Sequence, residues 1–122
     1  RGDAQNNVLT ATGNFVNDME GGAGNDTLIG GGGADNLDGG VDTDTADYSA
    51  SAARINANLT TGVGLGGDAQ GDTLTNIENL IGTNAALTDF LTGNAGDNVI
   101  AGLAGADQIN GMGGNAFKIL GP

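Results

Sequence analysis

A unit of nine residues repeats without interruption in the first part of the chain. Three copies follow one another, beginning at Gly21, Gly30 and Gly39. Each copy opens with two glycines, carries Asp at its sixth place and has an apolar residue at its eighth. A short fixed period restricts a chain to stacked, repetitive architectures, because each unit buries its apolar residue only against neighbouring units.

The same period returns later in the sequence. The sixth places of the copies 84–92, 93–101 and 102–110 are held, in that order, by Asp89, Asn98 and Asp107. A further copy begins at Gly111 but has Ala116 where the acid belongs and Lys118 at the apolar place. We therefore expect a second block of stacked units that loses its pattern towards residue 119.

The sequence between the two blocks is less regular. Residues 67–75 fit the nonapeptide and resemble residues 2–10, so a larger unit of about 60 residues occurs twice. Within the least repetitive stretch, Ile55, Ala57 and Leu59 alternate with polar residues. That alternation predicts one more strand.

The glycines of residues 62–67 have the GxGxxG spacing of a dinucleotide-binding turn. No helix pattern follows them, which the nucleotide-binding motif requires. We interpret these glycines instead as a turn between two coils.

The charge of the chain excludes several classes of function. Fifteen acidic residues against three basic ones give a net charge of −12. Nucleic-acid surfaces and anionic membranes attract Lys and Arg, so we expect neither as a partner. No apolar stretch approaches the roughly 18 residues of a membrane span, so we expect no membrane insertion. Acidic side chains in this excess suit hard cations with oxygen ligands, chiefly Ca²⁺.

The absent residue types narrow the chemistry further. There is no Cys and no His, so zinc, iron–sulfur, haem and copper sites lose their usual ligands. General-base catalysis usually relies on His, and the serines have no base to activate them. We therefore predict that the chain is not an enzyme.

The repeat itself has the chemistry of a calcium turn. Glycine adopts backbone conformations in which other residues clash, so a Gly-rich hexapeptide turns tightly and aims several carbonyl oxygens at one point. The Asp at its end adds a carboxylate, and the three residues after it are extended with the middle one buried. Two repeats make one coil, so equivalent turns stack about 4.8 Å apart and bring two carboxylates within range of one Ca²⁺.

These copies, read as GGxGxD followed by x-apolar-x, resemble the hemolysin-type calcium-binding repeats of the RTX family. The resemblance is strong over 21–47 and 93–115 and weaker over 2–20 and 67–92. It implies an all-β, right-handed parallel β-roll, a β-solenoid with calcium ions in its turns. The expected organisation is a degenerate entry segment (1–20), a first repeat block (21–47), connecting solenoid coils (48–83) and a truncated second block (84–119).

The resemblance also implies a ligand set. In that family each ion lies between turns n and n+2, one giving its second and fourth carbonyls and its Asp, the other its first and third carbonyls and its Asp. The residues implied here are Gly22, Gly24 and Asp26 with Gly39, Val41 and Asp44; Gly30, Gly32 and Asp35 as half of a second site; and Gly102, Ala104 and Asp107 with the turn that ends in Asp89. The other half of the second site falls on a turn in which Asn17 replaces Asp. Asn98 pairs with the position of Ala116, where we expect little binding.

Three roles follow from this resemblance. The first is a module that is disordered where calcium is scarce, folds on calcium binding after type I secretion, and stabilises a larger secreted or cell-surface bacterial protein. The second is a lattice or adhesin segment whose roll packs against copies of itself or cell-surface polysaccharide. The third is an accessory domain of a carbohydrate-active enzyme or protease.

Overall fold

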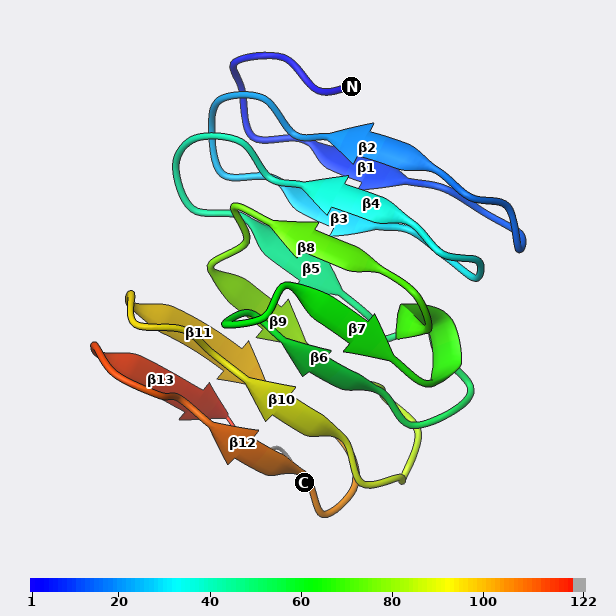
Figure 1. Cartoon of the computed structure of the whole chain (residues 1–122), viewed down its shortest axis with the longest axis vertical. Helices are drawn as coiled ribbons and strands as arrows, with labels where there is room; N and C mark the ends of the chain where they lie inside the picture. Colours follow the sequence, from blue (N-terminus) through cyan, green and yellow to red (C-terminus); the bar gives the residue numbers. More distant parts are fainter. Residues whose placement is uncertain (120–122) are drawn as a thin grey trace.

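The structure is a computed structural model that describes residues 1–119. Its strands form two stacked sheets, and the chain largely alternates between them from one end of the molecule to the other (Figure 1). The one helical segment among the described residues is the 3-10 helix η1 (Gly67–Ala69). Within residues 1–119, no helix has the length and apolar character needed to cross a membrane.

Sheet A has six strands within the described residues, and all of them are parallel. Their spatial order is β1 (Val8–Thr10), β3 (Thr27–Ile29), β5 (Thr45–Asp47), β9 (Asn79–Ile81), β11 (Asn98–Ala101) and β13 (Ala116–Ile119). The strands follow one another in sequence order along this sheet, as in a solenoid.

Sheet B has seven strands within the same residues. Their spatial order is β2 (Asp18–Glu20), β4 (Asn36–Asp38), β8 (Thr73–Thr75), β7 (Val63–Leu65), β6 (Asn56–Asn58), β10 (Phe90–Thr92) and β12 (Gln108–Asn110). All neighbours pair in parallel except β7, which is antiparallel to both β6 and β8. The predicted parallel β-roll is confirmed, with one reversed strand inserted in it.

Each short strand buries its middle side chain. Leu28 in β3 and Leu37 in β4 are fully buried, while the residues on either side of them keep contact with solvent. This alternation is the two-residue period of an extended backbone. One buried Leu contributes about 1.5–3 kcal/mol. A single coil therefore has little apolar burial of its own and depends on its neighbours.

Repeats one coil apart stack as the sequence predicts. Leu28 lies between Leu9 on one neighbouring strand and Ala46 on the other, and Met19 of β2 lies beside Leu37 of β4. The prediction that two repeats make one coil is therefore confirmed for the tandem block.

The coil pattern changes between β5 and β9. From β5 the chain enters β6, reverses through β7 and returns as β8, which pairs with β4. Figure 1 shows β7 pointing against its two neighbours. Three strands of sheet B, β6, β7 and β8, thus lie between β5 and β9, where a regular coil would have one.

Two sequence predictions for this region have different outcomes. The strand expected from the alternation of Ile55, Ala57 and Leu59 is confirmed as β6, and all three side chains are buried. The interpretation of residues 62–67 as a turn between coils is wrong, because part of this stretch forms β7. Gly64 packs so closely on η1 that an added Cβ would lie 2.6 Å from the Ala69 carbonyl oxygen.

The apolar core is thickest in the middle of the chain. Of the fourteen buried apolar side chains within residues 1–119, nine lie in residues 48–92 and three in residues 21–47. The nine are Tyr48, Ile55, Ala57, Leu59, Ala69, Leu74, Ile77, Leu80 and Leu91. We call residues 48–92 the central segment and residues 21–47 the tandem segment.

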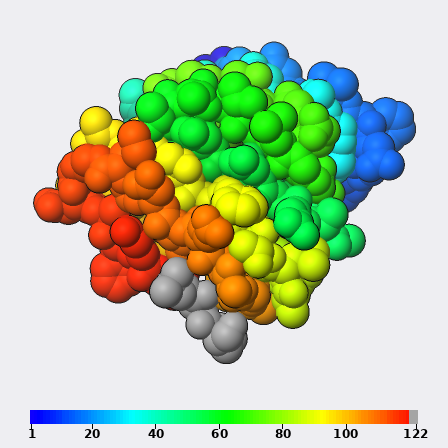
Figure 2. All heavy atoms as spheres, turned by 60° about the horizontal axis from the view of Figure 1, so that its bottom comes forward, coloured from blue at the N-terminus to red at the C-terminus, as the bar shows by residue number. Residues whose placement is uncertain are grey.

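The apolar row of sheet A stops before its last strand. β13 pairs with β11 so that Lys118 lies opposite the buried Ile100 and Ala116 opposite Asn98. This register confirms that Lys118 takes the apolar place and that Asn98 pairs with Ala116. Figure 2 shows this face of the molecule, where β12 and β13 are coloured orange to red.

Candidate calcium-binding turns

The sixth-place residues line the two edges of the roll, where the chain turns before each strand. Asp26 and Asp44 lie in turns that lead into sheet A, which we call A-side turns. Asp35, Asp89 and Asp107 lie in turns that lead into sheet B, which we call B-side turns. The ligand candidates therefore fall on two opposite edges.

Backbone hydrogen bonds join the A-side carboxylates into a ladder. The Asn7 N–H donates to Asp26 Oδ1 at 2.8 Å, and the Asp26 N–H donates to Asp44 Oδ1 at 2.8 Å. The Asp44 N–H donates in turn to Glu78 Oε2 at 2.8 Å. Each carboxylate thus uses one oxygen to hold the preceding coil.

The second oxygen of the two tandem aspartates is unsatisfied. Asp26 is 1% exposed and Asp44 is 0% exposed, and within residues 1–119 the Oδ2 atom of each has no hydrogen-bond partner. A buried carboxylate oxygen without a partner is costly, by several kcal/mol when it carries charge. Two such oxygens on stacked turns fit a hard cation that binds both.

The glycines of this turn pair allow the two backbones to approach closely. Gly40 has φ +91°, and a Cβ on it would collide with the Gly22 carbonyl oxygen. The Val41 N–H donates to that same oxygen at 3.0 Å. No backbone N–H within residues 1–119 donates to the carbonyls of Gly24, Gly39 or Val41. Three of the four predicted carbonyl ligands are therefore free to accept a cation.

Electrostatics in this turn pair also favour a cation. Burial raises the pKa of Asp44 to about 6, with smaller contributions from the negative charges of Asp26, Glu78 and Asp42 and against the lowering effect of the hydrogen bond from the Asp26 N–H. A bound Ca²⁺ would reverse this effect, because it replaces repulsion between carboxylates with attraction to a common ion.

The ligand types point to calcium in particular. Within the described residues, no group of three or more His, Cys, Asp or Glu side chains is arranged around a common point. The turns offer instead two carboxylates and several backbone carbonyls. A ligand set of oxygen atoms, rich in carbonyls, is typical of Ca²⁺ and does not suit transition metals.

The first B-side pair is bridged by an amide. The turn with Gly32 stacks on the turn with Gly13, whose carbonyl accepts the Gly32 N–H at 2.9 Å. Asn17 Nδ2 donates to Asp35 Oδ1 at 3.0 Å, to the Phe15 carbonyl at 2.9 Å and to the Gly30 carbonyl at 3.4 Å. Asn17 thus links both turns with a neutral donor, although Asp35 Oδ2 remains without a partner among the described residues.

The second B-side pair, the turns of Asp89 and Asp107, offers only one unsatisfied carboxylate oxygen. The Asp89 N–H donates to Asp107 Oδ1 at 2.9 Å, so the two predicted residues are brought together. Burial raises the pKa of Asp107, whose Oδ2 lies against Gly102 and has no hydrogen-bond partner within residues 1–119. Asp89 has no such free oxygen, because Thr83 donates to its Oδ2 from both N–H and Oγ1, at 2.7 and 3.0 Å. Ala104 lies in the same turn as Gly102 and Asp107.

Two acidic residues that accept backbone hydrogen bonds from a neighbouring coil were missing from the ligand set predicted from the sequence. Asp72 accepts the Asp35 N–H at 2.7 Å, and Glu78 accepts the Asp44 N–H. A signal for both is present in the sequence, since each precedes a buried Leu by two residues, as Asp26 precedes Leu28. Asp72 takes the sixth place of the copy 67–75, which fits the nonapeptide, whereas irregular spacing hid the signal for Glu78.

Comparison with protein-family models gives the same picture. The RTX calcium-binding nonapeptide repeat matches residues 12–46 and 85–117 in four copies, which is more than half of the chain. Repeats of this family bind calcium ions, form parallel β-rolls and are structural units. A comparison with curated proteins gave no match. The turns with unsatisfied carboxylates and the family match agree, and the chain belongs to the RTX calcium-binding nonapeptide repeat family.

Proposed function

We propose that this calcium-binding β-roll is a module that completes its fold when calcium enters its turns after secretion, and that it stabilises a larger extracellular or cell-surface bacterial protein. The observation that carries this proposal is the stacked pair Asp26 and Asp44, each buried with one oxygen unsatisfied among the described residues.

The main ion in this proposal lies between the turns 21–26 and 39–44. Its ligands are the predicted set, Gly22, Gly24 and Asp26 with Gly39, Val41 and Asp44. Asp35 and Asp107 each offer one further unsatisfied oxygen and form weaker half-sites with their own turns. Gly30 and Gly32 belong to the first of these half-sites, and Gly102 and Ala104 to the second.

Calcium then acts as a folding ligand. Without it, a chain with net charge −12 repels itself along the carboxylate ladders. Each Ca²⁺ cancels two charges and joins neighbouring coils, so its binding free energy becomes folding free energy. An affinity of order 10⁻⁴–10⁻³ M is usual for extracellular modules. Such an affinity keeps the tandem segment open in a calcium-poor cytosol, which suits export by type I secretion.

A calcium titration followed by far-UV circular dichroism tests this proposal. We expect a cooperative gain of β-structure with Ca²⁺ and none with Mg²⁺, which demands a small octahedral site. Identical spectra in chelator and in calcium would contradict calcium-driven folding. So would a chain that gains no structure in millimolar calcium.

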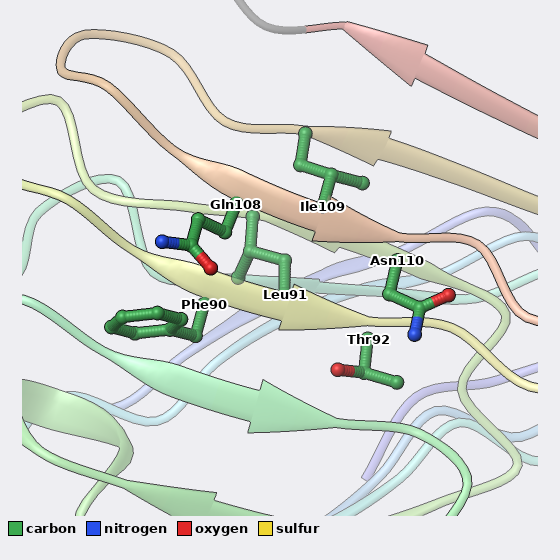
Figure 3. Close-up of a pocket in the computed structure, with 6 residues that line it drawn as sticks. All are labelled: Phe90, Leu91, Thr92, Gln108, Ile109 and Asn110. Carbon is green, nitrogen blue, oxygen red and sulfur yellow. The ribbon is translucent and has the colours of Figure 1, made fainter.

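A specific surface supports a second candidate, recognition of cell-surface polysaccharide. The outer face of β6, β10 and β12 carries Asn56, Phe90 and Gln108 in one cross-strand row. The next row carries Asn58, Thr92 and Asn110. Neither row contains a carboxylate, although the chain has fifteen acidic residues. Figure 3 shows Phe90 beside Gln108, and Thr92 towards Asn110.

The chemistry of these rows fits a neutral sugar chain. Hollows lie on both sides of Phe90, one lined by Gln108 and Asn110 and the other by Arg54, Asn56 and Leu65. Side-chain amides both donate to and accept from hydroxyl groups. An aromatic ring offers an apolar face to the C–H groups of a pyranose. We propose that this face binds a neutral cell-surface polysaccharide rather than a charged one.

Retention of the protein by an insoluble neutral glucan, in calcium, tests this second candidate. Phe90→Ala should abolish retention, whereas Phe15→Ala, which removes another exposed aromatic ring, should leave it unchanged. No retention of the unaltered chain would contradict the proposal. Association of copies in light scattering that Phe90→Ala removes would assign the face to self-packing instead.

A further inference from the structure

The central segment satisfies its sixth-place carboxylates with its own side chains. Asp72 is 1% exposed, and Tyr48 donates its hydroxyl to Asp72 Oδ2 at 2.7 Å. The other oxygen of Asp72 accepts the Asp35 N–H at 2.7 Å. Asp72 therefore occupies the place that Asp26 and Asp44 hold in the tandem segment, but neither of its oxygens lacks a partner.

Asp89 repeats this arrangement on a different turn. It is fully buried, and its Oδ1 accepts the Ile55 N–H at 3.0 Å. Its Oδ2 accepts two hydrogen bonds from Thr83, which is itself fully buried. The Oδ2 atoms of Asp72 and Asp89 are thus both satisfied by side chains of the central segment itself, without a metal ion.

The backbone of this segment is closed to a cation as well. In the turn before β8, the Gly66 carbonyl accepts the Ala69 N–H at 2.9 Å and the Ala69 carbonyl accepts the Asp72 N–H at 3.0 Å. The buried Ser51 hydroxyl accepts the Asp68 N–H at 3.0 Å and donates to the Ala53 carbonyl at 2.8 Å. In the tandem turns, the carbonyls of Gly24, Gly39 and Val41 accept no backbone N–H within residues 1–119, whereas here the turn carbonyls accept hydrogen bonds within η1 and its neighbours.

Apolar packing gives an independent reason for stability without metal. The central segment holds nine of the fourteen buried apolar side chains within residues 1–119. Burial of this kind is the main stabilising contribution to most folds, and it does not depend on an ion. The tandem segment, with three such side chains, has much less of it.

From these observations we propose that Tyr48 and Thr83 take the place of calcium in the central segment. A turn whose carboxylate accepts a hydrogen bond from one of these residues binds no ion, and a turn without such a donor does. Residues 48–92 then keep their structure without calcium, and the tandem segment docks on β8 and β9 as its turns fill. The docking half of this inference rests on the proposed function, whereas the metal-free central segment does not.

Amide hydrogen exchange of the full chain, measured by NMR in EGTA and in calcium, tests the inference. The Leu74 and Phe90 amides, which donate to the carbonyls of Gly62 and Ile55, report on the central segment. The Val41 amide, which bonds the Gly22 carbonyl, reports on the tandem turns. We expect Leu74 and Phe90 to be protected in both conditions and Val41 only in calcium.

Two variants assign the effect to the named donors. Tyr48→Phe and Thr83→Val each leave a buried carboxylate oxygen short of a donor. Each should reduce protection of the central amides in EGTA by about tenfold or more. Thr75→Val is the matched control, because Thr75 is exposed and its hydroxyl makes no hydrogen bond within the described residues.

The possible outcomes separate the two ideas. Exchange of Leu74 and Phe90 in EGTA at unfolded-chain rates overturns the inference, as does a Tyr48→Phe variant that behaves like the control. Protection of Val41 in EGTA equal to that in calcium overturns the calcium-driven folding of the tandem segment instead.

Discussion

The tandem segment and the central segment use the same structural unit in two ways. In both, a turn ends in a buried acidic residue, and a short strand with one buried apolar side chain follows. In the tandem segment the acids are Asp26, Asp35 and Asp44, whose Oδ2 atoms are unsatisfied among the described residues. In the central segment the acids are Asp72 and Asp89, and side-chain hydroxyl groups satisfy them.

This difference shows what the repeat itself requires. The turn needs a buried acceptor at its sixth place to hold the N–H of a neighbouring coil. The second oxygen of that carboxylate can be satisfied either by an ion or by a side-chain donor. Where an ion satisfies that oxygen, folding depends on the calcium concentration around the protein. Where a hydroxyl group satisfies it, folding does not.

The largest expected effect comes from removing the paired carboxylates of the tandem segment. Asp26→Asn together with Asp44→Asn should weaken the calcium response of residues 21–47 by at least about 100-fold, because neutral amides bind Ca²⁺ poorly. Isothermal titration with calcium measures the affinity. Asp18→Asn with Glu20→Gln removes the same charge from the outer face of sheet B and should have little effect. Equal losses in both double variants would mean that total charge, and not this turn pair, governs binding.

A pair of core truncations should separate the segments by their calcium dependence. Leu74→Ala and Leu28→Ala each remove a buried side chain and should cost about 2–5 kcal/mol where the site is folded. In EGTA, we expect only Leu74→Ala to lower the midpoint of urea unfolding. In calcium, both variants should lower it. A fall in EGTA for Leu28→Ala would show that the tandem segment is already packed without metal.

Acid should stabilise the fold that remains in chelator. Burial raises the pKa of Asp44 and of Asp72 to about 6, above the ordinary value of 3.8 that applies to an unfolded chain. The folded form therefore holds these protons more tightly, so its stability is greatest below about pH 4 and falls as the pH rises through 6. Between pH 7.5 and pH 5 we expect a gain of about 1 kcal/mol from Asp72, because in chelator the turn that holds Asp44 is open and its carboxylate keeps its ordinary pKa.

Urea unfolding in EGTA at the two pH values measures this gain. In calcium the stability should instead fall as the pH is lowered, because protons compete with Ca²⁺ for Asp44. We expect Asp44→Asn to leave the pH dependence in EGTA unchanged. A smaller gain in this variant would show that the tandem turn is already closed without metal.

The smallest effect is expected from changing the amide-bridged pair of turns at Asn17 and Asp35 into a pair with two carboxylates. Asn17→Asp removes the amide that bridges Asp35 and the carbonyls of Phe15 and Gly30, and it adds a second carboxylate beside Asp35. At calcium concentrations that fill the Asp26–Asp44 pair but not the new one, this should destabilise the first coil by about 1 kcal/mol. In calcium it should add one ion to the stoichiometry found by titration. An unchanged stoichiometry would show that the acid pair alone does not create a site on this edge.

Much of the calcium chemistry could be predicted from the sequence. The stacking of Asp26 on Asp44 and of Asp89 on Asp107 follows from the repeat, because the two turns lie one coil apart in sequence and in space. The buried row of Leu28, Leu37 and Ile100 follows from the same period. These features are local, so a regular spacing of residues is enough to fix them.

The hydrogen-bond donors that satisfy each carboxylate could not be predicted from the repeat. Tyr48 reaches Asp72 only because the hairpin β6–β7 carries the chain away from β5 and back to β4. Thr83 and Asp89 lie close in sequence, but nothing in the repeat indicates that this hydroxyl group turns inward. The register of Lys118 was visible from the pattern, whereas the reversal of β7 was not.

The sequence by itself determined the period, the sign of the charge, the identity of the cation and the turns that offer carboxylates to it. The tertiary structure alone decided which of those carboxylates remain unsatisfied. The physical reason is that a repeat positions oxygens through local backbone geometry. The donors that complete them, such as the Tyr48 hydroxyl, arrive from distant parts of the chain, and only the packing of the whole roll brings them within hydrogen-bond distance.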